Sequence, residues 1–120
     1  IVNIGSIVGE NGFTELAGYS STKGALKSLT KSVAVEHAKD NIRANIVIPG
    51  FIKTSYFNQF KQDKKKLYNW TINRTPMLRW GESNEVVSMI EFLISDDSSY
   101  ITGSSFNVDG GWLSSWKKKF

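Results

Sequence analysis

The sequence of 120 residues contains no cysteine and only one histidine, His37. Disulfide bonds and thiolate metal sites are therefore excluded, and a single histidine cannot supply a multi-histidine metal site. No apolar run approaches the roughly 20 residues of a membrane-spanning helix. Residues 1–5 also lack the basic and long apolar regions of a signal peptide. From these absences we expect a soluble, cytoplasmic protein that has no metal site and no contact with a membrane.

Positive charge is in modest excess, with a formal net charge of +4. Much of the excess lies in residues 61–66 and in the stretch 117–119. A nucleic-acid-binding surface would interleave basic residues with stacking aromatic side chains on one platform, and that arrangement is not visible. We interpret these lysines as a solvated helix face and a chain end, and we expect no nucleic-acid partner.

The hydrophobic pattern predicts alternating strands and helices. Residues 1–4 form a short apolar run that is typical of a buried parallel strand. Apolar residues recur at three- and four-residue spacing over residues 19–38, which predicts a helix, and Ser83 is the predicted N-cap of a later helix. The predicted order is strand 1–4, helix 19–38, strand 42–48, an excursion with one or two short helices over 51–82, helix 83–94 and strand 104–108.

This order predicts an α/β fold with a parallel sheet and helices on both faces. Parallel sheets are normally buried on both sides, and three strands alone would leave apolar faces and edges exposed. We therefore expect a second half of the domain to be missing from this sequence. We also expect the 120-residue chain to be unstable by itself.

Residues 19–23, Tyr-Ser-Ser-Thr-Lys, form a Tyr-x-x-x-Lys pair at the start of the predicted helix. One helical turn separates the two side chains, so they project from the same face. A phenol alone is too weak an acid to exchange protons near neutrality, but a fixed cation beside it stabilises the phenolate. Alone the pair is weak evidence, because chance produces it in roughly one chain in five of this length. The alternative is a packed aromatic residue and a solvated lysine.

Ser6 adds context to this pair. It lies thirteen residues before Tyr19, at the end of the first predicted strand, and ligands of open α/β sheets bind at the carboxyl ends of strands. A hydroxyl there can donate a hydrogen bond to a substrate oxygen. The second predicted strand ends at Pro49 and Gly50, and Thr54 brings a further hydroxyl to the same edge.

Taken in order, these segments resemble the short-chain dehydrogenase/reductase family. The resemblance implies that Tyr19 is the general acid/base, that Lys23 assists it and binds the nicotinamide ribose, and that Ser6 binds the substrate oxygen. Asn45 resembles a structural residue of the strand. The matching segments are residues 3–6 (Asn-Ile-Gly-Ser), 19–23, 42–50 (Ile-Arg-Ala-Asn-Ile-Val-Ile-Pro-Gly), 79–87 and 100–111.

The same resemblance implies a cofactor and a reaction. Pro49, Gly50, Ile52 and Thr54 resemble the segment that lies against the nicotinamide of NAD or NADP. The implied function is a hydride transfer that interconverts a small-molecule alcohol and a ketone or aldehyde, in a Rossmann-like doubly wound domain of which residues 1–120 form the C-terminal catalytic half. A homo-oligomer, dimer or tetramer, is implied for the full-length protein.

Within residues 51–82 the aromatic side chains leave two readings open, substrate contact by Trp70 or Tyr56 and packing into the core. The family's Gly-x-x-x-Gly-x-Gly turn, which seats the pyrophosphate at a helix N-terminus, is absent from the sequence. Two alternatives therefore stand beside the dehydrogenase. One is a truncated, catalytically inactive fragment. The other is a sugar-nucleotide epimerase or dehydratase, although the Pro49-Gly50 segment and the early Asp-Gly-Gly ending fit the shorter dehydrogenases better.

Overall fold

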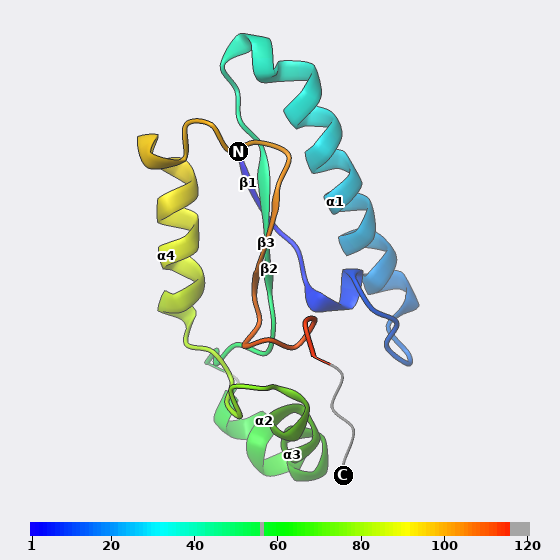
Figure 1. Ribbon diagram of the computed structural model, residues 1–120. Helices are drawn as coiled ribbons and strands as arrows, with labels where there is room; N and C mark the ends of the chain where they lie inside the picture. Colours follow the sequence, from blue (N-terminus) through cyan, green and yellow to red (C-terminus); the bar gives the residue numbers. More distant parts are fainter. Residues whose placement is uncertain (56, 116–120) are drawn as a thin grey trace.

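Three parallel strands lie between helices in the computed structural model, which describes residues 1–55 and 57–115 (Figure 1). The strands are β1 (Val2–Ile4), β2 (Asn45–Pro49) and β3 (Ser105–Val108), and β2 lies in the middle. In the register, Asn3 lies opposite Ile46, and Val47 lies opposite Phe106. All three carboxyl ends therefore meet at one edge of the sheet. The predicted α/β class and parallel sheet are confirmed.

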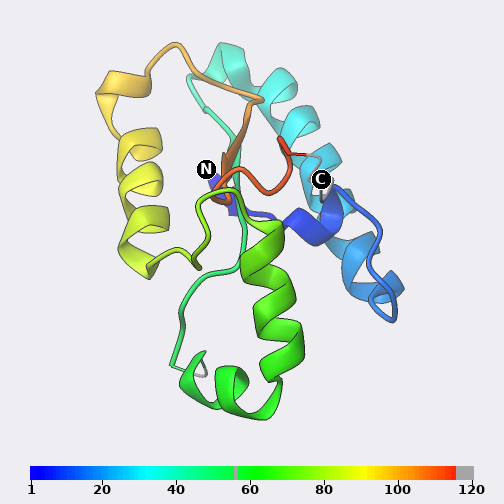
Figure 2. The same ribbon diagram turned by 60° about the horizontal axis from the view of Figure 1, so that its bottom comes forward.

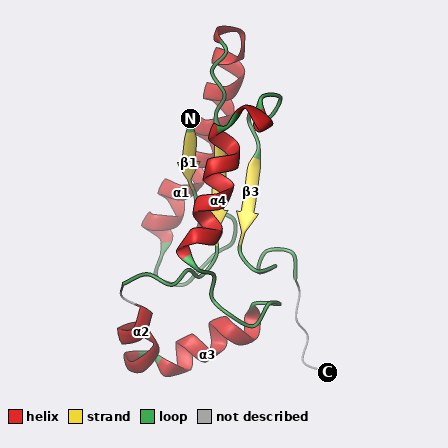
Figure 3. Ribbon diagram, turned by 90° about the vertical axis from the view of Figure 1, so that its left-hand side faces the viewer, coloured by secondary structure: helices red, strands yellow, loops and turns green. Residues whose placement is uncertain are grey.

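Two long helices cover the two faces of this sheet. Helix α1 (Ala17–His37) lies on one face and α4 (Ser83–Ile94) on the other, as Figures 1 and 3 show from two directions. The short helices α2 (Phe57–Asp63) and α3 (Lys65–Arg74) lie beyond the carboxyl ends of the strands (Figures 1 and 2). Single turns of 3-10 helix occur at η1 (Ile7–Gly9), η2 (Ala38–Asp40) and η3 (Asp96–Ser98).

The central strand β2 explains why this stretch of sequence is almost continuously apolar. Ile46, Val47 and Ile48 are each at most 1% exposed. Successive side chains of a strand point to opposite faces, and Ile46 and Ile48 pack with Ile7 and the indole of Trp112 in the main core cluster. A strand with helices on both sides must be apolar on both faces.

One predicted boundary, at β2, and one predicted burial, at β1, are wrong. The second strand begins at Asn45, three residues later than predicted, because Arg43 serves the end of α4. Its guanidinium donates hydrogen bonds to the carbonyl oxygens of Leu93 (3.0 Å) and Ser95 (3.1 Å). The first strand was predicted to be buried, but Ile4 is 40% exposed. The reason is that β1 lies at an edge of the described sheet and pairs there with β2 alone.

The helix starts also differ from the prediction. Helix α1 begins at Ala17, two residues before the predicted start. The N-cap of α4 is Glu82, and Ser83 is the first helical residue. The Glu85 carboxylate accepts a 2.7 Å hydrogen bond from the backbone N–H of Glu82, so it satisfies one of the free donors at the helix start. The Ser83 hydroxyl instead donates to the carbonyl oxygen of Lys53 (2.9 Å).

The excursion between β2 and α4 contains two short helices, where one or two were expected, and its aromatic side chains form a small core of their own. Four rings surround Trp80 with centroid distances of 5.1–5.8 Å. The Trp80 indole N–H also donates to the Thr71 hydroxyl (2.7 Å). The two ends of the excursion are joined, since the backbone N–H of Lys53 donates to the Gly81 carbonyl oxygen (2.8 Å). The four rings belong to Phe51, Phe57, Phe60 and Tyr68.

Candidate active site

Ser6 lies just beyond the carboxyl end of β1. The backbone N–H of Gly5 still pairs with the carbonyl oxygen of Val47 (2.7 Å), so the sheet fixes the position of the next residue. The Ser6 hydroxyl oxygen then caps η1 by accepting a 3.2 Å hydrogen bond from the backbone N–H of Val8. A hydroxyl is a donor as well as an acceptor. Ser6 can therefore hold this turn and still donate its proton to a substrate oxygen.

Tyr19 and Lys23 project from the first two turns of α1. The ammonium nitrogen of Lys23 lies 5.7 Å from the centroid of the Tyr19 ring. It also donates a 2.8 Å hydrogen bond to the carbonyl oxygen of Ile4, two residues before Ser6. Tyr19 is 47% exposed, so its ring is open to a ligand. Lys23 thus connects the helix that carries the phenol with the strand that leads to the serine.

Close contact between η1 and α1 holds these groups together. The Ser20 hydroxyl donates a 2.7 Å hydrogen bond to the carbonyl oxygen of Val8. A Cβ atom at Gly9 would lie 2.9 Å from the Cβ of Lys23 and 3.1 Å from the backbone nitrogen of Gly24, so only glycine allows this approach. Sequence reasoning gave Ser20 no role, because its place between Tyr19 and Lys23 carries no signal of its own. The small residue at position 9 was the available signal for a tight approach.

The segment after β2 approaches the same place. The backbone N–H of Gly50 donates to the carbonyl oxygen of Val108 (3.0 Å). A Cβ atom at Gly50 would lie 2.8 Å from the Cα of Asp109, so the chain passes the turn after β3 without room for a side chain. Ile52 then pairs with Gly81 in an isolated parallel bridge. This bridge brings residues 52–54 against the start of α4.

One hollow with a volume of about 420 Å³ is lined by every catalytic and cofactor-binding residue expected from the sequence. The expected members are Ser6, Tyr19, Lys23, Pro49, Gly50, Ile52 and Thr54.

Helix α4 also contributes to this hollow, through Ser83, Val86 and Val87. Sequence reasoning missed these three residues. The available signal was the apolar pair Val86 and Val87 in the first turn of a helix, where side chains need not pack against the sheet. Val87 is 47% exposed. Trp70, expected as one of two alternatives to contact substrate, lines a different hollow. Tyr56 lies outside the described residues.

An ion pair next to the hollow holds the end of the excursion against α4. The guanidinium of Arg79 donates two hydrogen bonds of 2.7 Å to the two carboxylate oxygens of Glu85. This interaction, helped by the hydrogen bond from the Glu82 backbone, lowers the pKa of Glu85 from 4.5 to about 2. The same pairing raises the pKa of Arg79. Charge–charge contacts therefore fix the start of the helix that supplies Val86 and Val87.

The part of the chain that the structure describes has neither a metal-binding cluster nor a membrane-spanning helix. No group of three or more histidine, aspartate or glutamate side chains there is placed to bind a metal ion. No helix within the same residues has both the length and the apolar character that crossing a bilayer requires.

Comparison with known proteins gives the family. A family model described as enoyl-(acyl carrier protein) reductase matches residues 1–113. The chain belongs to the short-chain dehydrogenase/reductase family. Residues 1–113 include all of the residues that line the hollow, so the whole candidate site lies within the part of the chain that matches the family model.

Three relatives of this short-chain dehydrogenase/reductase illustrate the match. A tropinone reductase homologue of Arabidopsis thaliana is 45% identical over 112 residues, which are 93% of this chain and 42% of the relative. A structure of 4-hydroxyisoleucine dehydrogenase complexed with NADH has a TM-score of 0.90 and 40% identity, over 97% of this chain and 47% of the other. A gluconate 5-dehydrogenase from Burkholderia cenocepacia, in complex with NADP and tartrate, has a TM-score of 0.90 and 35% identity, over 97% and 45% of the two chains. The chain thus spans less than half the length of each.

Proposed function

We propose that this protein is an NAD(P)-dependent oxidoreductase that interconverts an alcohol and a ketone or aldehyde. The observation that carries the proposal is the single hollow that contains Ser6, Tyr19 and Lys23 together with the segment after β2. Two relatives of known structure, named as dehydrogenases and bound to NADH or NADP, support the choice of cofactor.

The residues present fit the nicotinamide and ribose end of such a cofactor. Pro49, Ile52 and Val86 give the hollow an apolar wall, and the Lys23 ammonium and the Thr54 hydroxyl supply hydrogen-bond donors. When bound, the nicotinamide would accept or supply the hydride at the substrate carbon. Pro49, Ile52 and Thr54 would orient its ring, and Lys23 would bind the ribose hydroxyls.

Binding of the rest of the dinucleotide needs more than this chain contains. Its sequence has no glycine-rich turn for the pyrophosphate. We propose that a dinucleotide-binding half, encoded beyond these residues, completes the site. The outer edge of β1 supports this proposal, because Ile1 and Ile4 are 62% and 40% exposed there, as expected for a strand that pairs with a further strand.

Each proposed catalytic side chain has a defined task in the proton transfer. During oxidation, the proton of the substrate hydroxyl passes to the phenolate oxygen of Tyr19 as the hydride leaves the same carbon. During reduction, the Tyr19 phenol returns a proton to the carbonyl oxygen. Ser6 donates a hydrogen bond to that oxygen in both directions, and Lys23 stabilises the phenolate.

Exposed apolar side chains of α1 support a homo-oligomer, dimer or tetramer, as a second part of this proposal. Leu29 is 55% exposed and Val35 is 81% exposed on this helix. Apolar residues that are exposed on a helix already packed against its own sheet favour contact with another subunit. Size-exclusion chromatography with light scattering on the natural full-length protein tests it, and a monomer at micromolar concentration would contradict it.

The experiment that tests the activity uses the natural full-length protein with panels of ketones and alcohols and follows the absorbance of reduced nicotinamide. Replacing Tyr19 by phenylalanine removes only the phenol oxygen and should lower kcat by about 10²- to 10⁴-fold. Tyr100→Phe is the matched control, because Tyr100 is fully exposed and does not line the hollow. Equal activity of the two variants would contradict the assignment of Tyr19.

The missing glycine-rich turn also favours the inactive-fragment alternative, and cofactor binding separates the two. A natural protein that binds NADH or NADPH, measured by the fluorescence of the reduced nicotinamide, supports the oxidoreductase. Absence of both binding and turnover would support the inactive fragment.

A further inference from the structure

A second hollow, with a volume of about 280 Å³, is connected to the proposed active site through the stretch of chain between Ser6 and Tyr19. It is lined by residues 11–14 of the loop after η1, by Trp70 and Arg74 of α3, and by Trp112. The loop begins directly after the turn that Ser6 caps and leads into the helix that carries Tyr19. A ligand group in this hollow would therefore contact the same short segment that supplies both proposed catalytic hydroxyls.

Three of the seven described residues that line this hollow are aromatic. Trp112 is 2% exposed and forms its base. Phe13 stacks on it at a centroid distance of 6.2 Å, and Trp70 meets it edge-on at 5.4 Å. Trp70 is itself 49% exposed, so part of its side chain is open to a ligand. Such rings suit the apolar part of a small molecule.

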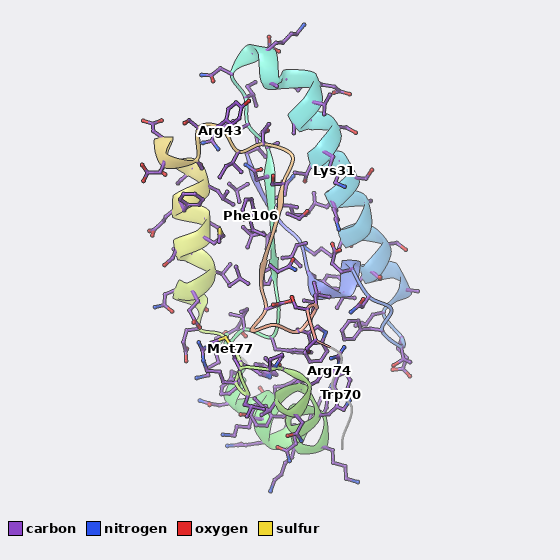
Figure 4. All side chains as sticks on the ribbon, viewed as in Figure 1. Lys31, Arg43, Trp70, Arg74, Met77 and Phe106 are labelled. Carbon is purple, nitrogen blue, oxygen red and sulfur yellow. The ribbon has the colours of Figure 1, made fainter. Side chains whose placement is uncertain are left out.

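Arg74 supplies the charge. Its guanidinium carbon lies 5.2 Å from the Trp112 ring, and Figure 4 shows its side chain close to that of Trp70 at the end of α3. Nη1 donates to the carbonyl oxygen (2.7 Å) and to the hydroxyl (3.3 Å) of Ser115. Among the described residues, none accepts a hydrogen bond from Nη2 or Nε. The ring contact and the Ser115 bonds hold the guanidinium in place, and its other N–H groups have no acceptor within residues 1–55 and 57–115.

The charge balance of the lining selects the kind of ligand. Among the described residues that line the hollow, Arg74 is the only charged one, so together they bring one positive charge and no carboxylate. Two parallel N–H groups on a planar guanidinium match the two oxygens of a carboxylate. A phosphate dianion would leave about one negative charge unpaired in this aromatic surrounding. A monoanionic carboxylate is therefore the group that fits.

The surrounding surface strengthens this conclusion. Residues 51–81 contain seven basic residues and one acidic residue, a net charge of +6, whereas the whole chain has +4. Two of the seven, Lys53 and Arg79, form ion pairs with glutamates that follow this stretch. The excess of positive charge thus lies over the carboxyl ends of the strands, where it attracts anions toward the site.

We propose that the substrate of this protein carries a carboxylate that Arg74 binds, with the adjoining apolar carbons against Trp70 and Phe13, and with the reacting oxygen at Ser6 and Tyr19. This rests on the proposed oxidoreductase function and specifies its substrate class as a hydroxy acid, oxidised to the matching oxo acid, or the reverse. In the oxidation the carbinol hydride goes to NAD(P)⁺ and the hydroxyl proton to Tyr19, and the carboxylate is unchanged.

The activity test compares short hydroxy acids with their methyl esters in the full-length protein. The acids should have KM values about 10- to 100-fold lower than the esters, from a charge-assisted hydrogen-bond pair of about 1.5–3 kcal/mol. Arg74→Gln should remove this difference by raising KM for the acids with little change in kcat, and Arg74→Lys should restore part of it. Lys65→Gln is the matched control, because it removes one exposed positive charge from the same helix without touching the hollow.

A binding test without cofactor separates this inference from the proposed function. Succinate should change tryptophan fluorescence saturably in the wild type and in Lys65→Gln, and not in Arg74→Gln, because Trp70 and Trp112 line the hollow. Trp70→Leu, which leaves the charge in place, should weaken both the signal and the preference for acids.

The two proposals fail in different ways. Turnover of neutral alcohols, with an acid-to-ester ratio near one that Arg74→Gln does not alter, would overturn the carboxylate site and leave the oxidoreductase standing. If no alcohol or ketone is turned over, the oxidoreductase proposal fails, and the succinate titration still decides on the carboxylate site. Saturable binding that depends on Arg74 supports it, and binding that is absent or unchanged in Arg74→Gln overturns it.

Discussion

The ammonium nitrogen of Lys23 donates a 2.8 Å hydrogen bond to the carbonyl oxygen of Ile4, nineteen residues earlier in the chain. This bond joins the first helix to the end of β1. It fixes the cation relative to the sheet as well as to its own helix, on which Tyr19 lies one turn earlier. The position of the charge beside the phenol is therefore set by two elements, which limits the motion of an otherwise flexible side chain.

Replacing Lys23 by methionine tests whether this fixed charge supports proton transfer. The variant keeps the length and the apolar stem of the side chain but loses the charge and the bond to Ile4. We expect kcat to fall by about 10²- to 10⁴-fold, because general acid/base catalysis usually contributes a factor of this size and Tyr19 depends on the charge of Lys23 for it. The measurement is steady-state turnover of the best alcohol or ketone found for the full-length protein.

Lys31→Met is the control for that prediction, because Lys31 is exposed on the same helix and away from the hollow (Figure 4). It should retain the activity of the wild type. A loss in Lys31→Met as large as in Lys23→Met would mean that the change acts through the helix and that the Lys23 ammonium has no special task.

Gly9→Ala should separate η1 from α1. The added Cβ would lie 2.9 Å from the Cβ of Lys23 and 3.0 Å from its carbonyl carbon, and backbone of this kind cannot give way locally. We expect a destabilisation of about 1–3 kcal/mol and a loss of activity, since Ser6 and Lys23 would move apart. Urea unfolding of the full-length protein, together with kcat, measures both effects.

Gly18→Ala provides the comparison for Gly9→Ala. A Cβ atom at Gly18 would meet nothing within 4 Å, and the residue lies in the first turn of α1. Alanine favours helix over glycine by up to about 1 kcal/mol, so this variant should be as stable as the wild type or slightly more so. Equal stability of the two variants would show that the close approach at Gly9 is not important.

The sequence was sufficient to predict those parts of the fold in which one physical pattern controls a whole element. The strand β2 is apolar on both faces because helices cover both, and its type could be read from that alone. The excursion could not be predicted in the same way. Its aromatic residues pack around Trp80 from several directions, so they follow no single period along the chain.

The residues of the candidate site also fall into two groups, those that could be predicted from the sequence and those that could not. Ser6, Tyr19 and Lys23 could be chosen because their chemistry and spacing are meaningful before folding. Val86 and Arg74 could not, since an apolar residue at a helix start and an arginine at a helix end are ordinary in sequence. Both depend on how the excursion folds back onto the sheet, which only the three-dimensional arrangement defines.

Replacing Asn45 should lower the stability of the protein without changing its catalysis. Its side chain is 1% exposed, donates to the carbonyl oxygen of Ile101 (2.9 Å) and accepts from the backbone N–H of Ser104 (3.0 Å). Asn45→Ala would leave both backbone groups without these partners, at a cost of about 1–3 kcal/mol for each group that stays buried. Asn107→Ala, at an exposed position of β3, should change the free energy of unfolding by less than about 0.5 kcal/mol. The folded fraction of Asn45→Ala should keep its kcat, and a reduced kcat would point to a role in the active site.

Acid should weaken the contact between Glu85 and Arg79 over a defined range of pH. The pKa of Glu85 is about 2 in the folded protein, against 4.5 for the free side chain, because of the hydrogen bonds from Arg79 first and from the Glu82 backbone second. A carboxyl group whose pKa is lowered by folding stabilises the folded state fully above its unfolded pKa and loses that contribution as the pH falls through its folded pKa. The difference in urea midpoint between the wild type and Glu85→Gln should therefore be constant above about pH 5 and shrink steadily from pH 4.5 toward pH 2.

The control for this prediction is the variant Arg79→Met, which removes the largest cause of the lowered Glu85 pKa. The difference in urea midpoint between Arg79→Met and the double variant Arg79→Met/Glu85→Gln should depend less on pH. If the difference in urea midpoint between the wild type and Glu85→Gln stays constant down to the lowest pH at which the protein is folded, the ion pair does not hold α4 in solution.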